Sequence, residues 1–185
     1  MKKLPFLAIV LAAFAFAALA QDTMKKDAPK PADPEVKVVL DSWNDIGRKL
    51  TAMAEDFPED KYDFKATPAE RSFAEQLLHA AGSCYYFPNT VTGQKPPAGD
   101  PPRDQYKSKA DIVAFVKKSF ADGAAAIQAQ GEKGMTTEFE YFPGQKSRVV
   151  DMAYGIIEHS GEHYGQLVVY YRLAGLVPPE SRPKK

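Results

Sequence analysis

The chain has 185 residues, and its 24 basic and 24 acidic side chains give a formal net charge of zero at pH 7. A neutral chain without a run of basic residues gives no electrostatic reason to expect a nucleic-acid partner. Cys84 is the only cysteine, so no disulfide can form within the chain. Stability must come from packing, with bound metal as the other available source.

The first twenty residues have the features of a bacterial secretory signal peptide. Lys2 and Lys3 form a charged start, residues 4–17 are an apolar run, and residues 18–20 fit the small-x-small rule for cleavage before Gln21. We therefore expect segment 1–20 to be removed, and the mature protein to be periplasmic or secreted without a stable membrane anchor. The alternative is an uncleaved anchor, but the apolar run is short for a membrane span.

The rest of the chain is predicted to be a leader and one domain. Residues 21–33 are polar and contain prolines, which is typical of a flexible leader. Residues 34–180 are then one domain. Within it, apolar residues recur at spacings of three and four in four segments, as on the buried face of a helix. The four helices are expected at about residues 34–55, 68–87, 108–130 and 147–173.

Local start and stop signals support these limits. Residues 67–70 (Thr-Pro-Ala-Glu) form a capping box with proline at the first helical position, and Gly175 is a natural end for the fourth helix. A loop with five prolines is expected at 88–106, and residues 136–142 are predicted to be briefly extended. Four amphipathic helices in one domain indicate an all-α four-helix bundle.

The clearest functional signal is the pair His159 and His163. Both lie in one helical stripe, whose members are spaced four, three, four, three and four residues apart: Met152, Ile156, His159, His163, Gln166 and Tyr170. Side chains at i and i+4 are roughly 5–6 Å apart at Cβ, so two imidazoles can share one metal ion with bonds of about 2 Å. The alternative is a pair of hydrogen-bonded core histidines. The remaining histidine, His79, falls off the centre of its helix's apolar stripe, and the pattern leaves its role open.

Residues 159–163 also spell H-x-x-E-H, the motif of inverzincin metalloproteases, in which the glutamate is the general base. Here Glu162 lies about 100° round the helix from His163. Only 22 residues follow His163, with Glu180 as the one acid among them. A protease is therefore disfavoured.

Other side chains are candidates for the surroundings of this site. Gln166 and Tyr170 share the histidine stripe, and we assign them, with Glu162 and Tyr86, to the pocket or to the residues that support the ligands. Glu162 is also a candidate general base, although its helical phase places it poorly. Cys84 lies within an apolar stripe, which favours a buried structural thiol over a nucleophile or a fourth ligand.

The C-terminal segment is similar to a known family. Residues 159–179 resemble the last helix of the DinB-like proteins, whose pattern is H-x-x-x-H, then G-Q-L, then Y-x-R and G-x-x-P-P. Residues 62–79 resemble the start of that family's second helix. The resemblance implies a four-helix bundle with a divalent metal, commonly zinc or nickel, held at one end by His79, His159 and His163. Many relatives carry a further histidine where this chain has Glu162.

Characterised relatives include metal-dependent thiol S-transferases and isomerases that use small cytosolic thiols, whereas the signal peptide implies an exported protein. We expect an exported metal-binding protein, either a metal-dependent hydrolase or a thiol S-transferase, that acts on an unknown small molecule. Three neutral histidines leave a coordination position open for water or substrate. The alternative is a non-catalytic metal- or ligand-binding bundle. A homodimer is compatible with either, because related bundles often dimerise.

Overall fold

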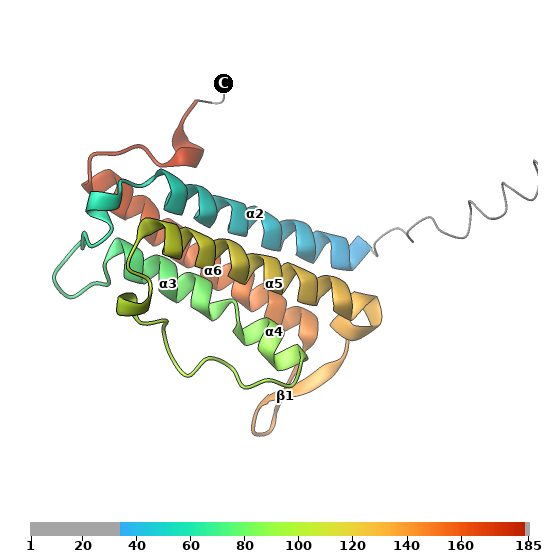
Figure 1. The fold of residues 1–185 in the computed structure, drawn as a ribbon. Coiled ribbons are helices and arrows are strands. Elements are labelled where there is room, and N and C mark those ends of the chain that lie inside the picture. Colours follow the sequence, from blue (N-terminus) through green and yellow to red (C-terminus); the bar gives the residue numbers. More distant parts are fainter. Residues whose placement is uncertain (1–33, 184–185) are drawn as a thin grey trace, which may run out of the picture. The chain divides into compact units, whose positions relative to one another are not determined.

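The computed structural model describes residues 34–183, which form a helical bundle with a small β-hairpin (Figure 1). The expected signal peptide and leader, residues 1–33, lie outside the described residues. The helices are α2 (Pro34–Asp56), α3 (Phe73–Ser83), α4 (Tyr86–Val91), α5 (Lys109–Met135) and α6 (Val149–Leu173). Three single 3-10 turns complete the helical elements: η1 (Glu59–Lys61), η2 (Arg103–Gln105) and η3 (Pro179–Ser181). Among the described residues, no helix is both long and apolar enough to cross a membrane.

The four longer helices occupy the four corners of the bundle, which confirms the predicted all-α architecture. α2 packs against α5 and α6, and α3 packs against the same two helices, so α2 and α3 are diagonally opposite. Between them lies one core of apolar side chains. Trp43 of α2 is fully buried there, donates its indole N–H to the Phe120 carbonyl at 2.9 Å, and contacts the Phe87 and Phe120 rings.

The predicted start of the second helix is wrong by five residues. The capping box that forms is Ser72–Glu75, and α3 begins at Phe73. Residues 64–72 instead form a turn that ends in an isolated bridge between Lys65 and Ser72. Tertiary contacts fix this start, because Phe73 is fully buried and stacks on Phe57 with ring centroids 3.8 Å apart.

The second helix is also divided. α3 ends at Ser83, and α4 continues the chain to Val91, beyond the expected end at residue 87. Pro88 is the third residue of α4. The first four N–H groups of a helix have no partner within it, so a proline at this position removes no helical hydrogen bond. Residues 88–91, predicted as the beginning of the proline-rich loop, therefore belong to the short helix α4.

The remaining limits are close to the predicted ones. α5 extends to Met135, but Gly131 breaks the helical path with φ 58° and ψ −175°, one residue after the predicted end. The predicted extended segment forms β1 (Glu138–Phe142), which pairs in antiparallel fashion with β2 (Gln145–Arg148). Gly175 follows α6 with φ 76°, as expected for a glycine that ends a helix.

Candidate metal centre

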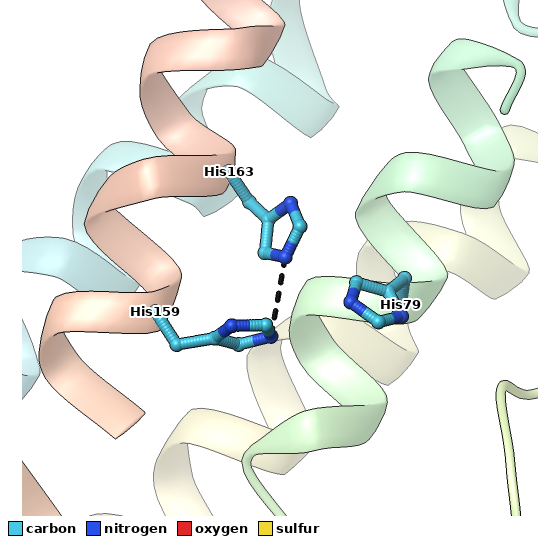
Figure 2. A group of neighbouring side chains, drawn as sticks. All are labelled: His79, His159 and His163. Carbon is cyan, nitrogen blue, oxygen red and sulfur yellow. Dashed lines mark hydrogen bonds between the residues drawn. The ribbon is translucent and has the colours of Figure 1, made fainter. Parts of the chain in front are cut away.

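Two helices bring the three histidines together (Figure 2). α6 presents His159 and His163 one turn apart, and α3, which packs against α6, presents His79. Each ring offers one nitrogen, and these three atoms all lie within 4.8 Å of one another. Among the described residues, this is the cluster of histidine, cysteine and acidic side chains that could hold a metal ion.

The two α6 rings approach each other through their Nε2 atoms, which are 3.1 Å apart. A tetrahedral ion with bonds of about 2.0–2.1 Å keeps its nitrogen ligands about 3.3 Å apart. Two imidazole lone pairs cannot face each other at this distance without a shared proton or a shared cation. The separation therefore suits joint ligation by His159 and His163.

His163 is held from behind by two glutamines. Its Nδ1 lies 2.9 Å from Gln166 Oε1 and 2.5 Å from Gln76 Nε2, and the Gln76 amide also donates to Gln166 Oε1. When Nδ1 carries the proton, it donates to Gln166 Oε1 and leaves the Nε2 lone pair free for a metal. In this tautomer the Gln76 amide, itself a donor, bonds to Gln166 Oε1 and not to Nδ1. Gln76 is 2 % exposed, so this support is part of the core.

His159 has a looser environment. Its Nε2 lies 3.2 Å from Ser83 Oγ, and its Nδ1 lies 4.0 Å from Glu162 Oε2. Ser83 was not among the predicted site residues. Its position four residues after His79 on α3, and therefore on the same helix face, was the available signal.

His79, whose role the periodicity left open, points toward the other two rings. Its side chain is 18 % exposed, and its ring centroid lies 4.5 Å from that of His163 and 5.2 Å from that of His159. Its Nδ1 lies 2.6 Å from Asp100 Oδ1. Nε2 is thus the nitrogen left for a ligand.

An open cleft of about 550 Å³ begins at His79 and His159 and runs along α6. Its lining residues are His79, Ser83, Tyr86, Ser147, Asp151, Met152, Gly155, Ile156, Glu158, His159 and Glu162. The expected pocket residues Tyr86 and Glu162 are among them, whereas Gln166, an exposed residue of α6, contacts His163 Nδ1 outside the cleft. Tyr170 does not line the cleft. It donates to the Arg71 carbonyl at 2.6 Å and meets the Phe64 ring edge-on, because its turn of α6 lies beyond the histidines.

Cys84 does not take part in the site. Its side chain is fully buried, and its Sγ lies 3.5 Å from the Ala80 carbonyl. Burial raises the pKa of this thiol to about 12, so it stays protonated at neutral pH. This agrees with the expectation of a structural thiol.

Both histidines of α6 have a lowered pKa, which favours the neutral imidazole at pH 7. Burial lowers the pKa of His163 to about 4, although its hydrogen bond to Gln166 acts in the opposite direction. Burial, with a smaller effect from the neighbouring His79, also lowers the pKa of His159. A neutral imidazole is the form that binds metal.

The low pKa of His163 predicts a pH-dependent stability of the metal-free protein. From pH 6.5, the ordinary value, down to about 4, the unfolded chain takes up a proton at His163 that the folded chain does not. The free energy of unfolding is therefore highest above this pH window. It should fall by on the order of 2 kcal/mol as the pH is lowered through the window. Urea unfolding of the parent and of His163→Gln at pH 7 and pH 4.5 measures the effect. Equal losses in both proteins would contradict it.

The fold and the site define a class: a helical bundle with a candidate three-histidine metal centre between two of its helices. A model of the DinB superfamily matches residues 42–167, and the chain belongs to this superfamily. The fold is similar to that of a DinB-like protein from Bacillus subtilis, with a TM-score of 0.63 and 20% identity over 79% of this chain and 99% of the other. A DinB-like protein from Bacillus cereus gives a TM-score of 0.60 and 21% identity over 76% and 93%. No curated protein matches the chain.

Proposed function

We propose that the protein is a metal-dependent enzyme, and that His79, His159 and His163 hold a divalent ion, zinc or nickel, at one end of the cleft. The observation that carries the proposal is the convergence of three imidazoles at the end of an open cleft that two of them, His79 and His159, line. Such an ion, when bound, supplies a Lewis acid that lowers the pKa of water or thiol and polarises an acceptor group. Three histidine ligands leave room for that water, thiol or substrate.

The lining of the cleft favours hydrolysis over transfer of an anionic thiol. Its lining includes three acidic residues, Asp151, Glu158 and Glu162, and no lysine or arginine. Arg148 pairs with Asp151, which leaves two carboxylates to face a ligand. Like charges repel, so these carboxylates disfavour an anionic cosubstrate and suit a neutral or cationic small molecule. A metal-dependent hydrolase is the first candidate, and a thiol S-transferase is the second.

Glu162 is the side chain that we propose as proton acceptor. It lines the cleft, its side chain is 62 % exposed, and it lies 4.0 Å from His159 Nδ1. Helical phase alone disfavoured this role, but the cleft extends far enough round α6 to include Glu162. From there the carboxylate can accept a proton from an attacking water and pass it to the leaving group.

Turnover should fall about 100-fold or more in Glu162→Gln, the size typical of a lost general base. Metal content should stay at the parent level, because the substitution leaves all three histidines in place. The assay is a panel of neutral and cationic esters and amides, with zinc or nickel supplied.

Glu158→Gln is the matched control, since Glu158 also lines the cleft, whereas Glu162 is the carboxylate that lies 4.0 Å from His159 Nδ1. Its rate should stay within a few-fold of the parent. Equal rates for the two variants would remove Glu162 from the mechanism.

A second candidate function is a metal-stabilised bundle without turnover. It is favoured by the placement of His79 on α3 and the other two histidines on α6, since one ion would then link two helices. A large chelator-induced fall in Tm, with no turnover of esters, amides or thiol–electrophile pairs, would favour it over the enzyme.

We further propose that the protein acts outside the cytoplasm, on the strength of the signal-like pattern in residues 1–20. Mass spectrometry of the protein from a bacterial periplasm should then give a chain that begins at Gln21. A chain that keeps its first twenty residues would reject the cleavage.

A further inference from the structure

Asp100 reaches the metal centre from the proline-rich segment 92–108, which connects α4 to α5. Its Oδ1 lies 2.6 Å from Nδ1 of His79, the ring nitrogen on the side away from the other histidines. Asp100 therefore contacts a candidate ligand without being a member of the ligand cluster.

A carboxylate at this position decides which nitrogen of His79 is available. A neutral imidazole carries its proton on either nitrogen, and only the nitrogen without the proton can bind a metal. A proton on Nδ1 that is donated to Asp100 leaves Nε2 as the free lone pair. The same hydrogen bond fixes the orientation of the ring.

Asp100 is itself held in place by Arg71. Its other oxygen, Oδ2, accepts from Arg71 Nε at 3.2 Å and from Arg71 Nη2 at 3.1 Å. Arg71 directly precedes Ser72, the N-cap of the helix that carries His79. One oxygen of Asp100 thus contacts His79 within α3, and the other contacts Arg71 just before the start of α3.

The next residue, Pro101, anchors the segment on α3. A Cβ placed on Gly82 would lie 2.6 Å from Pro101 Cδ and 2.9 Å from Cγ, so the proline ring occupies the space that a side chain would need. Gly82 is buried and lies three residues after His79, on a neighbouring part of the same helix face. This close contact places the neighbouring Asp100 at His79.

We propose that Asp100 is a positioning residue of the metal centre, and that segment 92–108 sets the metal affinity through the Asp100–His79 hydrogen bond and the Pro101–Gly82 contact. The proposal rests on the three-histidine site of the proposed function but not on turnover. Arg71, Asp100 and His79 form one chain of hydrogen bonds that ends at the ligand nitrogen.

The test uses the untagged chain from Gln21 and zinc as the probe. Asp100→Ala should weaken zinc binding 10- to 100-fold, as expected for loss of a residue that orients a ligand. In the metal-free protein, ¹⁵N NMR should show His79 changing from the Nδ1–H form to a mixture of tautomers. Asp100→Asn keeps an acceptor oxygen and should recover most of both properties.

Two further variants separate positioning from general damage to the segment. Gly82→Ala should displace Pro101 and weaken zinc binding in the same direction, with the helical circular dichroism preserved. Asp63→Ala removes the ion pair with Arg103, 3.0 Å long, which anchors the same segment but touches no histidine. Its zinc affinity should stay within twofold of the parent.

Zinc affinity within twofold of the parent and an unchanged tautomer in Asp100→Ala would overturn the proposal. So would an equal loss in Asp63→Ala. A parent protein that binds neither zinc nor nickel would reject the proposed function instead, and the tautomer measurement would still decide the role of Asp100.

Discussion

The metal content is expected to fall from one ion per chain in the parent to none in His163→Ala. His163 is 6 % exposed, and its Nε2 faces that of His159 at 3.1 Å. Alanine removes one of three proposed ligands and leaves a two-histidine site in which water must replace the lost bond. Loss of a supporting residue alone typically costs 10- to 100-fold in metal affinity, so loss of the ligand itself should cost more.

Elemental analysis of the untagged chain from Gln21, loaded with zinc or nickel and then gel-filtered, measures the effect. Tyr164→Phe is the control, because Tyr164 is the next residue on α6 and packs against the core without being one of the proposed ligands. It should keep the parent metal content. A fully loaded His163→Ala protein would show that the ion binds elsewhere or through other side chains.

The fold could be predicted where a helix carries its own signals. α6 has a regular helical stripe from Met152 to Tyr170 and a glycine with positive φ just past its end, and its predicted limits differ little from Val149–Leu173. The second helix could not be placed in this way, because residues 67–70 and 72–75 both have the pattern of a capping box. Local chemistry does not choose between them. The choice depends on burial of Phe73 against Phe57, two residues from different elements.

The candidate site also has a part that local sequence patterns predict and a part that depends on tertiary contacts. His159 and His163 belong to one helix, so their spacing alone brings them together, whereas His79 was expected on family resemblance and not on periodicity. Asp100 was not predicted, because it lies 21 residues from His79 in a loop without a regular pattern. Gln76 is 87 residues from His163. The only sequence signal for Gln76 was that it is a polar residue about one helical turn before His79.

Gly123→Ala is expected to destabilise the fold by about 3 kcal/mol, at the upper end of the usual cost of overpacking a core. A Cβ at Gly123 would lie 1.9 Å from Cζ2 of Trp43, where α5 meets α2. Trp43 cannot turn aside without breaking its hydrogen bond to the Phe120 carbonyl and its contacts with two aromatic rings. The two helices must therefore separate, and the loss of packing exceeds the gain of about 1 kcal/mol that alanine brings to a helix interior.

Gly165→Ala isolates the effect of this contact, because Gly165 also lies inside a helix but nothing would lie within 4 Å of its added Cβ. Alanine there should be neutral or stabilising by up to about 1 kcal/mol. Since both variants carry the same gain in helix propensity, their difference in free energy of unfolding, measured in urea at pH 7, reports the steric cost at Trp43. Equal stabilities would mean that α2 and α5 adjust to the methyl group without loss, and that the close approach of these helices at Gly123 does not constrain the bundle.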